Sequence, residues 1–200
     1  MEKKTALITG AASGIGAACA RRFAHGGYDL ILTGRNQEKL HEVSLQLQKE
    51  GTDVLTLAFD ITNRNAAMQA VSQLNDRWSQ IDVLINNAGL ALGLEKEYEG
   101  NMDEWDTMID TNIKGLLTMT RLVVPKMIER QCGHVINIGS VAGDAAYAGG
   151  NVYCATKAAV KALSDGLRID VAHTPIRVTN IKPGLVETNF SNVRFHGNKE

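Results

Sequence analysis

The chain has 200 residues, of which 21 are lysine or arginine and 22 are aspartate or glutamate, so its formal net charge is −1. This balance lacks the basic patch of a nucleic-acid-binding protein, and we expect no nucleic-acid partner. The length suits one α/β core, and no linker, repeat or low-complexity segment divides it. We therefore predict a single domain over residues 1–200.

The cysteines and the N-terminal segment indicate a compartment. Cys19, Cys132 and Cys154 are odd in number and lack a C-x-x-C spacing, which is typical of reduced thiols, and the five histidines form no metal-binding motif. The apolar run after Lys3 and Lys4 is interrupted by glycine, which fits a phosphate loop better than a secretory signal. No apolar stretch has the length of a membrane span. We predict a cytoplasmic protein without a metal or a membrane partner.

Short apolar runs alternate along the chain with helical segments. The predicted strands cover residues 5–9, 30–33, 54–59, 83–85, 134–138 and 177–181. The predicted helices cover residues 17–25, 36–50, 63–78, 103–130 and 151–172. Asn36 and Gly51 are typical first and last signals of a helix, and Gly115 and Pro125 predict irregularities in the longest one. This alternation predicts βαβ units and an α/β fold, a doubly wound Rossmann-type parallel sheet of six strands flanked by helices.

A glycine-rich turn follows the first predicted strand and precedes the first predicted helix. Glycines let the backbone approach phosphates, and the free N–H groups of a helix start favour negative charge. The spacing is G-x-x-x-G-x-G instead of the commoner G-x-G-x-x-G, and such a pattern alone is often only a tight turn. The flanking strand and helix favour a dinucleotide site. The predicted cofactor-binding residues are Gly10, Ala11, Ala12, Ser13, Gly14, Ile15 and Gly16.

Tyr153 and Lys157 are one helical turn apart, and Ser140 precedes them at the end of a predicted strand. Residues at i and i+4 share a helix face, so a phenol and an ammonium group project together. A phenol titrates near ~10 in water, and a cation beside it lowers that pKa, which makes tyrosine a usable general acid or base. A serine hydroxyl nearby would hold a carbonyl oxygen. Because Y-x-x-x-K also occurs on surface helices by chance, this assignment depends on the rest of the chain.

In order and spacing these motifs resemble the short-chain dehydrogenase/reductase family over essentially the whole chain. Thr9, residues 86–89 (NNAG), Asn112 and residues 183–184 (PG) complete the resemblance. It implies that Tyr153 is the general acid when a carbonyl is reduced and the base when an alcohol is oxidised.

The resemblance gives roles to the neighbouring residues as well. It implies that Lys157 holds the nicotinamide ribose and lowers the Tyr153 pKa, while Ser140 binds the substrate oxygen. It further implies that Asn112 supports a water that passes protons to Lys157, although a side chain that stabilises a helix kink is the alternative. For Ser140 the alternative is a strand-end cap. Asn87 would line the cofactor cleft, stabilise the sheet, or do both. The remaining cofactor residues that the resemblance implies are Asp60 and Ile61 beside the adenine, and Pro183, Gly184 and Val186.

The end of the second predicted strand indicates which cofactor is bound. Residues 33–35 read TGR, and no carboxylate follows until Glu38. An acidic side chain here would hold the 2′-hydroxyl of NAD, whereas a guanidinium suits the 2′-phosphate of NADP. Arg35 therefore predicts NADP(H), with a solvated loop charge as the alternative.

Four stretches are similar to one branch of the family, the NADP-dependent 3-hydroxy acid dehydrogenases, at residues 86–93, 105–112, 147–153 and 190–195. Members of this branch act on serine, L-allo-threonine and related acids, and reduce malonic semialdehyde. Such small-molecule substrates carry a carboxylate, and a cation near the pocket is required to orient it. Arg194 is our candidate and would bind substrate with Ser140 and Tyr153; the alternative is an ordinary surface residue.

The C-terminal residues differ from the family pattern. Members continue through further helices and a seventh strand, whereas nothing after Ile181 reads as a strand here, so we expect a shortened domain with an exposed sixth strand. Family tetramers use this region, which leaves a homo-oligomer, dimer or tetramer, open. Two other functions also remain open: a 3-oxoacyl carrier-protein reductase and a non-catalytic NADP-binding module.

Overall fold

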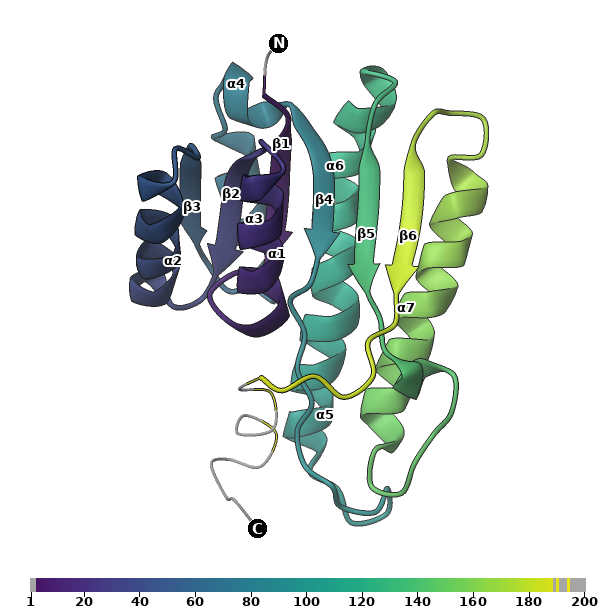
Figure 1. The fold of residues 1–200 in the computed structure, drawn as a ribbon. Helices are drawn as coiled ribbons and strands as arrows, with labels where there is room; N and C mark the ends of the chain where they lie inside the picture. The colour runs from purple at the N-terminus through teal and green to yellow at the C-terminus, as the bar shows by residue number, and fades with distance from the viewer. Residues whose placement is uncertain (1–2, 189, 191–193, 195–200) are drawn as a thin grey trace.

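The computed structural model describes residues 3–188, 190 and 194, which form a parallel sheet between two layers of helices (Figure 1). The strands are β1 (Thr5–Thr9), β2 (Asp29–Gly34), β3 (Val54–Ala58), β4 (Ile81–Asn86), β5 (His134–Ile138) and β6 (Arg177–Ile181). Their order is β3-β2-β1-β4-β5-β6, and every neighbouring pair is parallel. This order confirms the predicted Rossmann-type sheet. Of the stretch 190–195, residues 191–193 and 195 lie outside the described part of the chain, as do residues 196–200.

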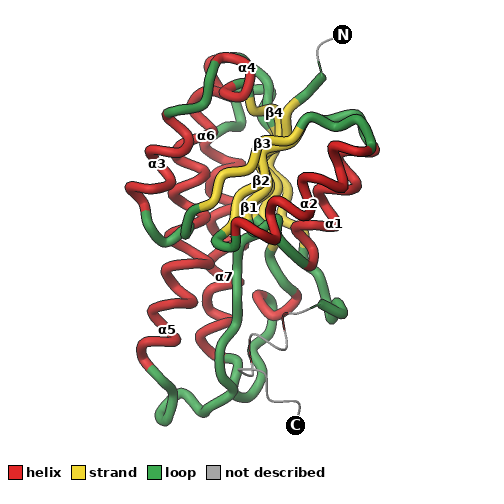
Figure 2. Tube along the Cα trace, turned by 90° about the vertical axis from the view of Figure 1, so that its left-hand side faces the viewer, coloured by secondary structure: helices red, strands yellow, loops and turns green. Residues whose placement is uncertain are grey.

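The helices divide between the two faces of the sheet. They are α1 (Gly14–His25), α2 (Gln37–Lys49), α3 (Arg64–Ser72), α4 (Asp76–Ser79), α5 (Met102–Ile109), α6 (Leu116–Glu129) and α7 (Asn151–Asp170). Figure 2 shows α1 and α2 on one face and α3, α6 and α7 on the other. A hydrophobic core lies on each face of the sheet, and successive side chains of a buried strand point into the two cores in turn. In β1, Ala6 and Ile8 belong to one core and Leu7 belongs to the other. Among the described residues, no helix is both long enough and apolar enough to cross a bilayer.

The single helix predicted over residues 63–78 is wrong, because two helices occupy this segment. Asn63 caps α3 by accepting a hydrogen bond from the backbone N–H of Ala66 at 3.1 Å, and Asn75 caps α4 in the same way through Trp78 at 3.1 Å. An asparagine side chain offers the backbone an alternative to helical bonds, which favours a new start at Asn75.

The long helix predicted over residues 103–130 is interrupted by a π-helical segment, η1 (Asp110–Gly115). Gly115, where an irregularity was predicted, ends this segment and packs on Ile61, whose Cγ1 lies 3.0 Å from the position of an added Cβ. Pro125, the other predicted irregularity, lies within α6 without ending it. The π-helical turn is the irregularity that matters for function, because it contains Asn112.

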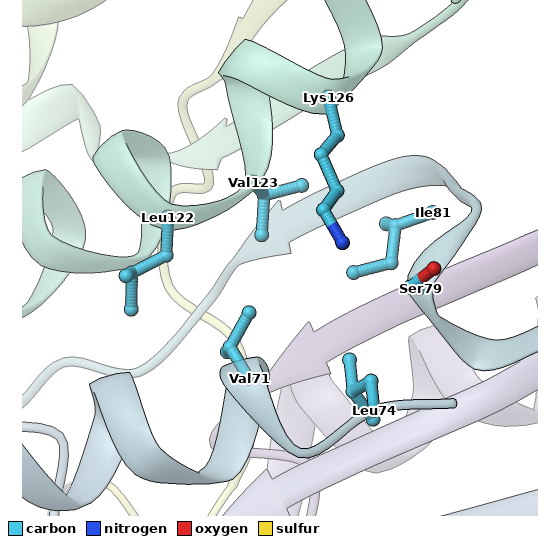
Figure 3. Close-up of a pocket in the computed structure, with 7 residues that line it drawn as sticks. All are labelled: Val71, Leu74, Ser79, Ile81, Leu122, Val123 and Lys126. Carbon is cyan, nitrogen blue, oxygen red and sulfur yellow. The ribbon is translucent and has the colours of Figure 1, made fainter. Parts of the chain in front are cut away.

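A small hollow lies between α3, α4 and α6, with Lys126 extending over it (Figure 3). Its lining is mostly apolar and includes Ile81, the first residue of β4. Ligands of open α/β sheets bind at the opposite edge, where the strands end. We therefore treat this hollow as part of the packing between the helices.

Candidate active site

The predicted site residues gather at the carboxyl ends of the central strands. The glycine-rich turn follows β1, Asn87 follows β4, and Ser140 follows β5. The segment 182–188 leaves β6 and passes below the ends of the neighbouring strands toward the glycine-rich turn (Figure 1). Its far end reaches that turn, because the Thr188 side chain lies 3.4 Å from where a Cβ on Gly14 would be.

Three positions of the glycine-rich turn favour glycine, through their backbone angles or their close packing. Gly10 and Gly14 have positive φ angles of 64° and 53°. A Cβ on Gly16 would overlap the carbonyl oxygen of Gly10 and lie 2.5 Å from the amide nitrogen of Asn87. The α1 helix begins at Gly14, and the backbone N–H of Ala11 ties the turn to the carbonyl of Thr33 on β2 at 3.0 Å. This tightly packed turn, which runs directly into the start of a helix, fits a pyrophosphate.

Asn87 connects this turn to the sheet. Its side-chain amide donates to the carbonyls of Thr9 at 2.9 Å and Gly10 at 3.1 Å. Its backbone N–H donates to the Thr9 hydroxyl at 3.0 Å. These contacts show the sheet-stabilising role that we considered, and the role of Asn87 in lining the cofactor cleft stays a prediction.

Ser140, Tyr153 and Lys157 lie close together at the end of β5. The Ser140 hydroxyl accepts a hydrogen bond from the backbone N–H of Ala142 at 3.1 Å, which caps the 3-10 turn η2 (Val141–Gly143). The same side chain hydrogen-bonds Tyr153. The Lys157 ammonium lies 5.8 Å from the centre of the Tyr153 ring and donates to the carbonyl of Ile138 at 2.9 Å. The structure thus brings the predicted trio together, with Ser140 both capping a turn and contacting Tyr153.

The protonation of this trio differs from the sequence-based expectation. Burial raises the pKa of Tyr153 above its ordinary value, and this effect outweighs the opposing hydrogen bond of Ser140 and the charge of Arg194. Burial also lowers the pKa of Lys157, which is only 7% exposed, to about 8. The net shift of the Tyr153 pKa is therefore upward, whereas the sequence predicted a downward shift, because burial of the phenol outweighs the effect of nearby charges.

Polar contacts hold α7 against the sheet and against η1. Asn112, which is buried, uses its side chain to accept from the Leu90 N–H at 2.8 Å and to donate to the Leu90 carbonyl at 2.8 Å and to the Thr156 hydroxyl at 3.0 Å. These contacts tie η1 to the loop after β4 and to α7, and the water-relay role of Asn112 stays a prediction. Further along α7, Asn137 of β5 donates to the Ser164 hydroxyl at 2.9 Å. These contacts fix the position of α7 along the sheet.

The residues predicted around the adenosine half of the cofactor occupy different environments. Arg35 is 67% exposed in its side chain and lies 4.0 Å from the Asp60 carboxylate. Asp60 also accepts hydrogen bonds from Thr62. Ile61 is buried in the core, so its side chain does not face the cleft. Arg35 at the end of β2 keeps the accessible charge that a 2′-phosphate requires.

The remaining predicted cofactor residues follow β6. The Pro183 carbonyl accepts a hydrogen bond from the Val141 N–H at 3.2 Å, which holds this segment beside η2. Gly184 lies in open space, and Val186 is exposed. The segment leaves the Val186 side chain open to solvent, so the predicted cofactor contacts of Pro183, Gly184 and Val186 stay predictions.

Arg194 lies beside Tyr153, and the alternative of a surface residue is wrong because its exposed fraction is 9%. Its guanidinium carbon lies 5.8 Å from the centre of the Tyr153 ring. Its Nε donates to the Gly93 carbonyl at 3.1 Å, and its Nη1 donates to the Tyr147 hydroxyl at 2.6 Å. The Phe190 ring packs 5.8 Å from that of Tyr153. No role was predicted for Tyr147 or Phe190 from the sequence, where the signal was that both lie within stretches similar to the 3-hydroxy acid branch.

A Rossmann-type sheet with a phosphate cradle after β1 and a serine, a tyrosine and a lysine beside it defines a nicotinamide-dependent oxidoreductase. The model of the short chain dehydrogenase family matches residues 4–199, and the chain belongs to this family. The NADP-dependent 3-hydroxy acid dehydrogenase YdfG of Salmonella typhimurium is 52% identical over 195 residues, which are 97% of this chain and 77% of that protein. Serine 3-dehydrogenase of Rhizobium radiobacter is 47% identical over 196 residues, with 98% and 77% covered.

Solved structures give the same result. The closed form of a serine dehydrogenase complexed with NADP+ superposes with a TM-score of 0.92 at 50% identity, and covers 97% of this chain and 77% of that chain. Serine dehydrogenase from Escherichia coli superposes with a TM-score of 0.87 at 49% identity, with 91% and 83% covered. These similarities confirm the predicted family, its fold and its branch.

Proposed function

We propose that this chain is an NADP-dependent dehydrogenase of small 3-hydroxy acids, acting on serine, L-allo-threonine or malonic semialdehyde. The observation that carries the proposal is the buried Arg194 guanidinium next to the Tyr153 ring. A cation at this position suits a substrate that presents a carboxylate near the carbon that reacts. The names of the similar proteins support the same substrate class.

Each residue of the site has a separate role in this reaction. NADP, when bound, accepts or supplies the hydride. Tyr153 transfers the proton at the substrate oxygen, and Ser140 donates a hydrogen bond to that oxygen as charge develops on it. Lys157, whose pKa of about 8 lies near neutrality, holds the ribose and supplies positive charge beside the phenol. The glycine-rich turn of residues 10–16 holds the pyrophosphate.

The test of this function is turnover by the purified chain. We expect oxidation of NADPH with malonic semialdehyde and reduction of NADP with L-allo-threonine or serine, both followed by absorbance. A 3-oxoacyl thioester is the matched alternative, and preference for it would replace the 3-hydroxy acid by a carrier-protein substrate. Binding of NADPH without turnover of any of these compounds would instead favour a non-catalytic module.

Cofactor preference depends on Arg35. We expect Arg35→Ala to raise the KM for NADPH about 10- to 100-fold, the usual effect of losing hydrogen bonds to a charged group, and to leave the KM for NADH unchanged. The matched control is Arg121→Ala on the outer face of α6, which removes an exposed charge far from the cleft. Equal effects on both cofactors would contradict a 2′-phosphate site at Arg35.

Location is part of the same proposal. Cys19, Cys132 and Cys154 are all free thiols. Free thiols suit a reducing compartment, and we place the enzyme in the cytoplasm on this ground.

A further inference from the structure

Tyr147 contacts Arg194 in two ways. Its hydroxyl accepts the 2.6 Å hydrogen bond from Nη1, and the centre of its ring lies 5.4 Å from the guanidinium carbon. A hydrogen bond from a charged donor is about twice as strong as a neutral one, and the ring adds a cation–π attraction. Tyr147 therefore restrains both the direction and the position of the guanidinium.

The Tyr147 ring packs against Gly150, which directly precedes α7. A Cβ on Gly150 would overlap this ring, so the ring lies directly against the backbone there. The backbone N–H of Gly150 donates to the Tyr147 carbonyl at 3.0 Å, which closes the turn. Gly149, with a φ of 72°, packs against the carbonyl of Leu94 and connects this turn to the loop that follows β4.

The loop after β4 restrains Arg194 from the other side. The Gly93 carbonyl accepts the hydrogen bond from Arg194 Nε at 3.1 Å, and the Gly93 N–H donates to the Arg194 carbonyl at 3.3 Å. Arg194 thus bridges the loop after β4 and the loop before α7, while its guanidinium faces the Tyr153 ring at 5.8 Å. A long side chain bound at both ends of its guanidinium loses most of its rotamer freedom before any substrate arrives.

We propose that Tyr147 is a specificity-determining residue that fixes the Arg194 guanidinium beside Tyr153 to receive the substrate carboxylate. This inference rests on the proposed function and explains the substrate specificity of the enzyme. The enzyme takes acids whose carboxylate lies a fixed distance from the hydroxyl carbon, and it discriminates against their neutral esters. Because a carboxylate is bound equally before and during hydride transfer, Tyr147 acts on KM and leaves kcat unchanged.

The experiment compares L-serine with L-serine methyl ester, each with NADP, in the wild-type chain and in Tyr147→Phe. We expect the variant to raise the KM for serine about tenfold, the usual effect of losing one charge-assisted hydrogen bond, with kcat within about twofold. The ester should be unaffected, so the ratio of kcat/KM for acid over ester falls about tenfold. Tyr28→Phe is the matched control, because Tyr28 packs on Phe23 at the far end of α1.

Three results would overturn the inference. These are an unchanged KM for serine, equal losses for serine and the ester, and a lower kcat at constant KM. NADPH binding by fluorescence confirms that each variant is folded. Should Tyr147→Phe fail this check, Gly150→Ala gives the same comparison, because it displaces the Tyr147 ring without removing any group. A wild-type chain that turns over acid and ester equally overturns this inference alone, whereas a wild-type chain without turnover overturns the proposed function.

Discussion

Tyr153→Phe is expected to lower kcat about 10²- to 10⁴-fold, the range for loss of a general acid or base. Phenylalanine keeps the ring that packs against Phe190 and lies beside Arg194, so the change removes only the hydroxyl. The Ser140 hydroxyl remains to polarise the substrate oxygen, but no other phenol lies on the Lys157 face of α7. The measurement is steady-state NADPH oxidation with malonic semialdehyde, together with the fluorescence-detected Kd for NADPH.

The Kd for NADPH should change less than about threefold, since the glycine-rich turn and Lys157 are untouched. This separates a lost proton donor from a misfolded site. Turnover within tenfold of the wild-type value would show that the proton comes from another group, and it would remove Tyr153 from the role that we propose.

The fold could be predicted closely because its strongest signals are local. Every strand was located within two residues of its bounds, and the cap at Asn36 is present, with its side chain accepting from the Lys39 N–H at 2.9 Å. Two features of the helices were not predictable in this way. The break before Asn75 depends on which of several asparagine side chains accepts a hydrogen bond from a backbone N–H. The π-helical turn at η1 depends on the buried contacts of Asn112.

The site was predictable where its residues share an element or follow one strand. Tyr153 and Lys157 share a helix face, and Ser140 follows β5, so spacing alone brings them together. Tyr147 and Arg194 are 47 residues apart in the sequence. Tyr147 lies in a loop, where no periodic pattern of residues predicts which side chains come into contact. The direction of the Tyr153 pKa shift was predicted wrongly for a related reason. It depends on how deeply the phenol is buried in the folded protein, which the sequence motif does not show.

Gly16→Ala is expected to weaken NADPH binding more than 100-fold and to lower Tm. The added methyl would overlap the Gly10 carbonyl and meet the amide of Asn87 at 2.5 Å. Neither neighbour is free to move, because the Asn87 amide is bonded to the carbonyls of Thr9 and Gly10. The α1 helix must then shift away from the turn, and its first N–H groups no longer converge on the phosphates. Overpacking of this kind costs about 1–3 kcal/mol, or roughly 2–4 °C in Tm per kcal/mol for a chain of this size.

The matched control for this prediction is Gly166→Ala within α7, where an added methyl meets nothing within 4 Å. Alanine is favoured over glycine in a helix by about 1 kcal/mol, so this variant should raise Tm and leave NADPH binding unchanged. The two substitutions are chemically identical, and only the space around them differs. A Gly16→Ala variant that kept both its Tm and its affinity for NADPH would mean that the turn relaxes without loss, and that the tight packing of Gly16 on Gly10 is not what shapes the phosphate site.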